Sequence, residues 1–251
     1  MIITWNLTIP RLSGDQTRRA YVYVPQSYGE DPERRYPVMY FFDGQNIFFD
    51  DDAAFGTSWG MEGYMLESER EMILVAIECN REGSGRLEEY SPFTFENSEL
   101  GRIKGRGKQY MHWLIKELKP YIDETYRTLP DRENTMIAGS SMGGLMALYA
   151  ATTFNSVFQR AACLSPSLWV APGKILELIA RAHIRRDTCI YLDYGAKEMF
   201  NHAANAEALF STAHLLMTKR VNLTFRIVPD GTHCEASWAN QVPIFMECLD
   251  V

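Results

Sequence analysis

Residues Thr135–Tyr149, TMIAGSSMGGLMALY, decide the fold. The first four, Thr135–Ala138, have the apolar and β-branched character of a buried strand, and a helical run opens at Leu145. Between them lies the segment GSSMGG, which contains a G-x-S-x-G motif. A sharp strand-to-helix turn of this kind holds its serine in strained backbone geometry, so the flanking residues must be small. The motif predicts a nucleophile at Ser141, whereas the alternative is a glycine-rich helix entry with an inert serine.

Short apolar runs on both sides of this motif predict further strands. They are Tyr21–Val24, Val38–Phe42, Met72–Ile77, Cys189–Leu192 and Leu223–Val228, and residues 1–10 also alternate like a strand. Several of these runs are continuously apolar, which is typical of strands that are buried on both faces of a sheet.

Longer segments between the strands carry apolar residues at helical spacing. Three expected helix faces are Tyr110, Leu114, Leu118 and Tyr121, with a break or kink near Pro120; Ala206, Leu209, Phe210, Ala213 and Leu216; and Trp238, Val242, Phe245, Met246 and Leu249, helical throughout. The alternation predicts an α/β fold with a mostly parallel twisted sheet of about eight strands and helices on both faces. In such sheets the active residues lie on loops that follow the carboxyl ends of strands.

Composition excludes several classes of protein and partner. The chain has 251 residues, 46% hydrophobic and 23% charged, which is enough to build one large core. A formal net charge of −7 makes nucleic acid and anionic membrane surfaces unfavourable partners. No run approaches the roughly 18 apolar residues of a membrane span and no secretory signal pattern is present, so a cytoplasmic location is expected.

The five cysteines show no metal-ligand spacing, and the sequence has no HExxH motif. We therefore expect neither a metal nor a cofactor, and we expect the cysteines to be free rather than joined in disulfides. The expected partner is a small-molecule ester, and the oligomeric state is left open.

A serine hydroxyl needs a neighbouring histidine to accept its proton. In folds with this motif the chain order is serine, acid, histidine. Of the five histidines, His112 and His214 lie inside expected helices, His183 ends one and His202 lies early in another. His233 follows a late strand on a loop and comes after every candidate acid, so we expect His233 to be the base.

The acid is expected in the segment Asp193-Tyr-Gly-Ala-Lys-Glu198, which follows the strand Cys189–Leu192. Asp193 ends the strand and could brace the loop, whereas Glu198 lies three residues past Gly195, far enough out to curl back to the histidine. The acid would fix the imidazole tautomer and stabilise the imidazolium. Position alone favours Glu198 and leaves both residues open.

Acyl transfer also needs two hydrogen-bond donors aimed at the oxygen where negative charge develops. The backbone N–H of Met142, directly after the serine, is one expected donor. The other is expected in the loop Asp43-Gly44-Gln45-Asn46, after the strand Val38–Phe42. Gly44 permits a tight turn and the N–H of Gln45 is the expected donor, although Asp-Gly turns are common at many kinds of site.

Together these motifs resemble the putative-esterase branch of the α/β-hydrolases, which includes esterase D, ferric-siderophore trilactone esterases, feruloyl and acetyl-xylan esterases, and mycolyltransferases. The resemblance covers nearly the whole chain, in residues 36–46, 86–92, 139–144, 165–169, 191–198 and 233–238. It implies that the acid lies three residues after the loop glycine, which places Glu198 ahead of Asp193. It also implies an oxyanion N–H just after the Asp-Gly pair, at Gln45. The chain departs from the trilactone-type relatives at Cys234, where they often carry Asn.

Aromatic residues crowd the loops near the expected site, and half or more of them are expected to belong to the core. The expected substrate contacts are Trp59, Tyr90, Trp169 and Trp238. Arg86 and Glu89 are spaced for a structural ion pair one helical turn apart, which is the favoured interpretation, and the alternative is that Arg86 faces an acidic substrate.

The leading hypothesis is a serine carboxylic-ester hydrolase that acts through an acyl-enzyme with a Ser-His-Glu triad. Its expected substrates are feruloyl- or acetyl-type esters of sugars or similar small esters. The alternatives are a siderophore (catecholate trilactone) esterase, an acyltransferase with the same triad, and a non-catalytic binding protein of the same fold. A site that extends from Gln45 to His233 predicts a single domain over residues 1–251. It leaves no room for a large lid, because the longest insertion, Cys79–Gly107, is under 30 residues long.

Overall fold

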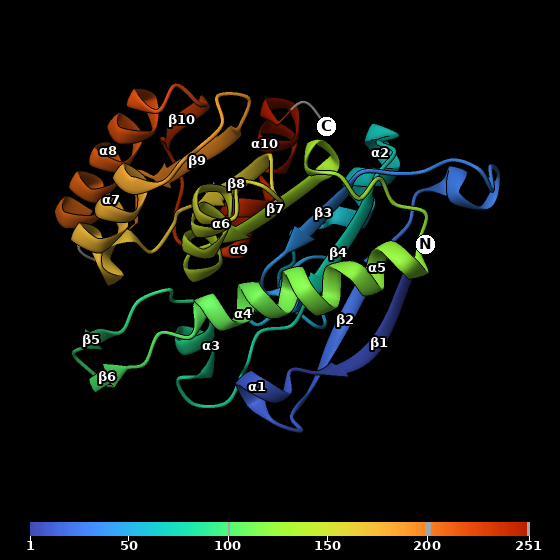
Figure 1. Ribbon diagram of the computed structural model, residues 1–251, viewed down its shortest axis with the longest axis horizontal. Coiled ribbons are helices and arrows are strands. Elements are labelled where there is room, and N and C mark those ends of the chain that lie inside the picture. Colours follow the sequence, from blue (N-terminus) through green and yellow to red (C-terminus); the bar gives the residue numbers. More distant parts are fainter. Residues whose placement is uncertain (100, 199–201, 250–251) are drawn as a thin grey trace.

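The computed structural model describes residues 1–99, 101–198 and 202–249. Within these residues, eight strands form one twisted sheet in the order β1-β2-β4-β3-β7-β8-β9-β10 (Figure 1). The strands are β1 (Ile2–Thr8), β2 (Thr17–Tyr23), β3 (Val38–Phe41), β4 (Ile73–Ile77), β7 (Thr135–Ser140), β8 (Arg160–Leu164), β9 (Cys189–Gly195) and β10 (Asn222–Val228). The expected fold class is confirmed.

The six strands from β4 to β10 in this order pair in parallel, whereas β1 and β2 are antiparallel additions at one edge. In the centre, β3 pairs with β7 so that Phe41 lies opposite Ala138. This register brings the loop after Phe41 and the glycine-rich turn after Ala138 to the same sheet edge, because the carboxyl ends of parallel strands lie together. The strand β8, whose small residues Ala161 and Ala162 give a weak apolar signal, was not predicted.

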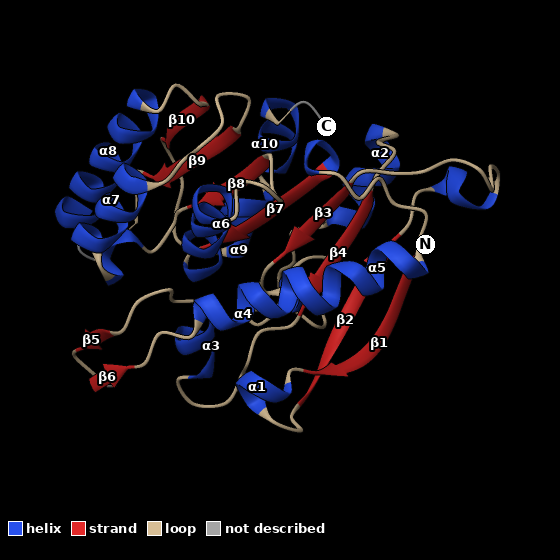
Figure 2. Ribbon diagram, in the orientation of Figure 1, coloured by secondary structure: helices blue, strands red, loops and turns tan. Residues whose placement is uncertain are grey.

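Helices cover both faces of the sheet (Figure 2). One face is covered by α4 (Gly107–Trp113), α5 (Lys119–Thr125), α6 (Met142–Thr153), α7 (Pro172–Arg181) and α8 (His202–Thr218). The other face carries α2 (Met61–Ser68), α9 (Glu235–Ala239) and α10 (Val242–Cys248). The short helices α1 (Pro10–Ser13) and α3 (Gly85–Glu89) lie in connecting segments.

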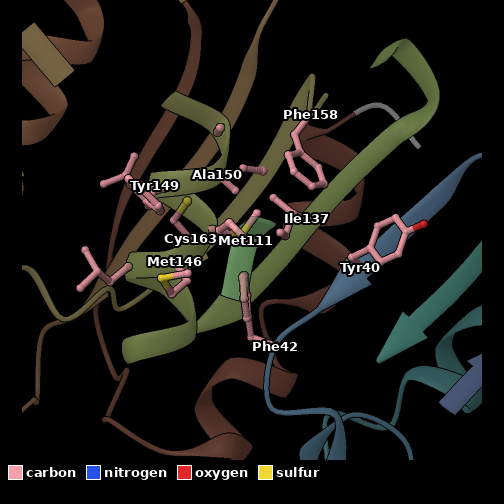
Figure 3. Packing of buried hydrophobic residues seen from close by; sticks show 14 of the residues in the cluster. Tyr40, Phe42, Met111, Ile137, Met146, Tyr149, Ala150, Phe158 and Cys163 are labelled. Atoms are coloured by element: carbon pink, nitrogen blue, oxygen red, sulfur yellow. The ribbon is translucent and has the colours of Figure 1, made fainter. Parts of the chain in front are cut away.

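The central strands are buried on both faces because their alternating side chains enter two separate apolar clusters. Tyr40 and Phe42 pack with Ile137 and Phe158 under the first helix layer (Figure 3). Their neighbour Phe41 belongs to the opposite cluster, where its ring packs against Trp59. The α6 helix is buried along almost its whole length, which fixes the turn that precedes it.

Two of the expected helices differ in detail. The long helix before residue 126 contains a wider π-helical turn, Leu114–Leu118, which ends two residues before Pro120. On its expected apolar face Tyr121 is exposed, and the next residue, Ile122, is buried instead. The C-terminal helix is not continuous, because α9 ends at Ala239 and α10 begins at Val242. All five apolar residues of that expected face are nevertheless buried.

The insertion at residues 79–107 contains α3 and a small hairpin of β5 (Phe95–Asn97) and β6 (Gly101–Ile103). Figure 1 shows this hairpin projecting beside the start of α4. Across the described residues, no helix combines the length and apolar character needed to cross a membrane. All five cysteines are free.

Candidate active site

Ser141 lies in a sharp turn between β7 and α6. Its backbone dihedral angles are φ 56° and ψ −120°, in the left-handed half of the map that non-glycine residues rarely occupy. Its N–H donates to the carbonyl of Leu164 on the adjacent strand, which holds the turn in place. A Cβ atom on Gly139 would lie 2.6 Å from the backbone of Gly143, so the turn cannot close with a larger residue there. The strained turn matches the sequence expectation for the motif.

His233 comes from the loop after β10 and reaches the same turn. Its Nε2 lies 2.8 Å from Ser141 Oγ, and its Nδ1 lies 2.9 Å from Glu198 Oε2. The imidazole is 41% exposed, whereas the Glu198 side chain is 5% exposed. Trp238 packs edge-on against the imidazole with ring centroids 5.0 Å apart. Ser141, His233 and Glu198 are therefore joined by one continuous chain of hydrogen bonds, and the serine in that chain borders the cavities.

Glu198 is held by several hydrogen bonds on its other oxygen. Its Oε1 accepts from the hydroxyl of Ser165 at 2.5 Å and from the N–H of Gly195 at 2.9 Å. Burial is the largest single influence and acts to raise its pKa, but the bonds from His233, Ser165 and Gly195 together leave the pKa of Glu198 below its ordinary value. Its carboxylate is therefore ionised at neutral pH.

Gly195, three residues before Glu198, allows the chain after β9 to lie close to the loop after β10. A Cβ atom on Gly195 would lie 2.4 Å from the carbonyl oxygen of Gly231 and 3.0 Å from Glu198 Oε1. The loop that follows β9 and the loop that follows β10 thus touch backbone to backbone, which brings Glu198 to His233.

Asp193, the other acid that the sequence left open, has a different position. It is buried, and it accepts hydrogen bonds from the N–H of Ser165 and the hydroxyl of Tyr191, each at 2.9 Å. It therefore braces the loop that carries Ser165. Burial is the main cause that raises the pKa of Asp193 to about 6.

This raised pKa predicts a measurable pH dependence of stability. The folded state binds the Asp193 proton more tightly than the unfolded chain, whose aspartate pKa is about 4. The stability contribution is therefore greatest below pH 4 and declines as pH rises to about 6, by roughly 3 kcal/mol. We expect Asp193→Asn to remove this decline. Urea unfolding of both proteins between pH 4 and pH 7 measures it, and parallel stability curves would contradict the prediction.

The loop after β3 lies beside the serine turn. Asp43 has a left-handed φ of 54°, and a single 3₁₀ turn, Gly44–Asn46, follows it. The Gln45 side chain is tied to the end of β4, because its Oε1 accepts the N–H of Cys79 at 3.2 Å. Met142 is the first residue of α6, and the N–H groups of a first helical turn have no acceptor within the helix. Gln45 borders the same cavity as Ser141, and Met142 directly follows Ser141, so both residues expected to supply oxyanion donors lie near the serine.

Arg86 on α3 clamps this loop. Its Nε and Nη2 donate to the two carboxylate oxygens of Asp43 at 2.7 and 2.8 Å. The N–H of Asp43 donates to the buried hydroxyl of Tyr90 at 3.0 Å. The expected pair between Arg86 and Glu89 does not form, because Glu89 points inward and pairs with buried Arg18 at 2.7 Å.

Two cavities meet at Ser141. The larger, about 810 Å³, is bordered by Gln45, by His233 and Cys234 of the histidine loop, and by Glu235 and Trp238 of α9, which follows that loop. The smaller, about 350 Å³, is bordered by Met142, Leu87, Ser167 and Trp169. Arg86, Ser141 and His233 border both cavities. An ester bound across Ser141 can therefore extend in two directions.

Of the four expected substrate contacts, the structure brings two to these cavities. Trp169 borders the smaller cavity and Trp238 the larger. The other two expectations are wrong: Trp59 is buried between Phe41 and Phe245 in the core, and Tyr90 is fully buried behind Asp43. Sequence reasoning missed Asn46 and Glu235, which border the larger cavity.

Comparisons with known proteins identify the family of this chain. A family model described as "Putative esterase" matches residues 13–244. A curated protein of Bacillus subtilis (strain 168), "Uncharacterized protein YbbA", is 25% identical over 184 residues, which cover 72% of this chain and 69% of that protein. The family resemblance seen in the sequence is confirmed.

Solved structures show the same α/β-hydrolase fold. An IroE-like serine hydrolase from Shewanella oneidensis matches with a TM-score of 0.80 at 18% identity, covering 100% of this chain and 80% of its own. A ferulic acid esterase matches with a TM-score of 0.71 at 20% identity, over 100% and 98% of the two chains. The enterobactin esterase of Shigella flexneri matches with a TM-score of 0.73 at 19% identity, over 99% of this chain and 58% of that one.

Proposed function

We propose a mechanism and a substrate class for this chain, which belongs to the putative esterase family and is therefore an esterase. It hydrolyses small carboxylic esters, of the acetyl or feruloyl type on sugars or similar alcohols, through an acyl-enzyme on Ser141. The observation that carries this proposal is the relay from Ser141 Oγ to His233 Nε2 at 2.8 Å and from His233 Nδ1 to Glu198 Oε2 at 2.9 Å.

In the first half of the reaction, Ser141 Oγ attacks the ester carbonyl while His233 Nε2 accepts the hydroxyl proton. The backbone N–H groups of Gln45 and Met142 donate to the oxyanion of the tetrahedral intermediate. His233 then returns the proton to the leaving alcohol, and the acyl group stays on Ser141. In the second half, water attacks the acyl-enzyme by the same steps and releases the acid. Glu198 holds the imidazole in the required tautomer throughout.

The two cavities support a division of the substrate. The leaving alcohol takes its proton from His233. The larger cavity is bordered by His233 and by three residues that follow it, Cys234, Glu235 and Trp238. We therefore place the alcohol there and the acyl group in the smaller cavity, against Trp169. An aromatic wall suits a feruloyl or another small acyl group. The fold likeness to a ferulic acid esterase agrees with this choice.

A fluorophosphonate probe tests the nucleophile directly. The probe phosphonylates an activated serine, and we expect peptide mass spectrometry to find the adduct on the peptide that contains Ser141. Heat-denatured protein serves as the control, because unfolding separates Ser141 from His233. Labelling that is absent, or that survives denaturation, would contradict the proposed mechanism.

A catecholate trilactone is the second candidate substrate. Arg81 and Arg86 both border the larger cavity, and although Glu78 and Asp43 pair with them, their guanidinium groups offer hydrogen-bond donors to an anionic catecholate. The enterobactin esterase fold likeness points the same way. A panel of methyl ferulate, acetylated xylo-oligosaccharides and a catecholate trilactone separates the candidates by kcat/KM. A trilactone turned over at least tenfold better than the other two would replace the first proposal.

A further inference from the structure

Glu235 is a buried carboxyl that the proposed reaction does not use. It is 6% exposed and begins α9, two residues after His233. It borders the larger cavity together with Ser141 and His233. A buried carboxyl is costly unless it has hydrogen-bond partners, so its place in this cavity requires a reason.

One oxygen of Glu235 has a fixed partner. Asn46 Oδ1 accepts the N–H of Ala54 at 2.9 Å, which determines the orientation of the Asn46 amide. Its Nδ2 consequently donates to Glu235 Oε1 at 3.0 Å. The Glu235 backbone N–H, at the start of α9, also interacts with this carboxyl. Among the described residues, Asn46 is the side chain that hydrogen-bonds to Glu235, at Oε1, and Oε2 has no side-chain partner.

The pKa of the Glu235 carboxyl is raised above its ordinary value. Burial is the largest cause and raises this pKa, as does Asp43, whereas the residue's own backbone N–H, Arg86 and His233 lower it. A carboxyl with a raised pKa is less favourable for a cation, which needs the ionised form, than for a hydroxyl group. A hydroxyl can donate to the ionised form or accept from the protonated form.

We propose that Glu235, held by Asn46 at Oε1, binds a hydroxyl group of the substrate through Oε2. This inference rests on the proposed function and narrows its substrate class to partial esters of polyhydroxy alcohols. The hydroxyl lies on the alcohol portion, a few bonds from the ester oxygen, because the cavity that Glu235 borders is the one around the histidine loop. Asn46 is a positioning residue, since it acts through Glu235.

Three matched acetates test the subsite. The first, 2-hydroxyethyl acetate, carries a hydroxyl group, and in propyl acetate a methyl group replaces it. In 2-methoxyethyl acetate the oxygen can accept a hydrogen bond but cannot donate one. A hydrogen bond to a charged or partly charged group contributes enough to change kcat/KM by about 10- to 100-fold. We expect the unaltered protein to prefer the hydroxyl compound over propyl acetate by that factor.

Two variants assign this preference to Glu235. Glu235→Gln keeps the bond from Asn46 and presents an amide donor to the cavity, so the preference for hydroxyl over methoxyl should fall to about threefold or less, or reverse. Glu235→Ala should bring the ratio of hydroxyl to propyl substrate to about one. The matched control is Glu247→Gln, which removes a carboxylate that is 82% exposed on α10 and should retain the ratio of the unaltered protein.

The outcomes separate the subsite from the proposed function. If the unaltered protein hydrolyses the acetates without preferring the hydroxyl compound, or if both variants keep the preference, the subsite is wrong and the esterase mechanism stands. If Ser141 is not labelled by the fluorophosphonate and no acetate is hydrolysed, the mechanism itself is wrong. A second series, ethyl hydroxyacetate against ethyl propanoate, places the hydroxyl on the acyl side. A preference confined to that series would overturn the assignment to the alcohol.

Discussion

Replacing Ser141 with alanine should lower kcat for p-nitrophenyl acetate by roughly 10⁴- to 10⁶-fold. The alanine has no oxygen at the position 2.8 Å from His233 Nε2, so no acyl-enzyme can form. The proposed oxyanion donors, the backbone N–H groups of Gln45 and Met142, would support only slow attack by water. The loss should appear in kcat, because the two cavities that bind the ester are unchanged. Steady-state kinetics with correction for spontaneous hydrolysis measures the effect.

Two neighbouring serines provide matched controls. Ser140 ends β7 and is buried, and Ser167 Oγ lies 3.3 Å from Ser141 Oγ. Ser140→Ala removes the same hydroxyl group one residue earlier and should retain activity within about tenfold. Ser167 is the nearest alternative nucleophile. Full activity in Ser141→Ala together with lost activity in Ser167→Ala would assign the nucleophile to Ser167.

The sequence predicts the serine turn and the histidine well because both depend on local rules. The G-x-S-x-G motif requires small flanking residues wherever it occurs, and the structure has the strained turn at Ser141. The order of serine, acid and histidine along the chain predicts His233 as the base, and the structure places His233 beside Ser141. Spacing alone does not distinguish the two candidate acids, because it places both Asp193 and Glu198 near the end of β9. The close approach of the loops after β9 and β10 distinguishes them, and that is a tertiary contact.

The contacts that sequence reasoning missed join residues far apart in the chain. Arg86 and Asp43 are 43 residues apart, and Asn46 and Glu235 are 189 apart. Neither pair has a local signal, because each forms only when strand ends assemble at one sheet edge. Trp59 and Tyr90 were misassigned for the opposite reason. A buried aromatic and a cavity-lining aromatic look the same in sequence, and only packing distinguishes them.

Glu198→Gln should lower kcat by about 10²- to 10⁴-fold while the fold is retained. The reason is the direction of the hydrogen bonds. Ser165 and Gly195 both donate to Glu198 Oε1, so the glutamine oxygen must take that position and its NH₂ group must face His233 Nδ1. Nδ1 then becomes an acceptor and the proton moves to Nε2. The imidazole would donate to Ser141 instead of accepting its proton, which is the wrong tautomer for a general base.

Asp193→Asn is the matched comparison, because it makes the same isosteric change at the other acid of the loop. It leaves the bonds of Glu198 to His233 in place, so kcat should fall by less than about tenfold. Thermal melting of both variants checks that neither is unfolded. Asp193 bonds to Ser165 and Tyr191, whereas Glu198 contacts His233 Nδ1, so the two acids have different partners. A larger loss of kcat in Asp193→Asn than in Glu198→Gln would therefore move the orienting role from Glu198 to Asp193.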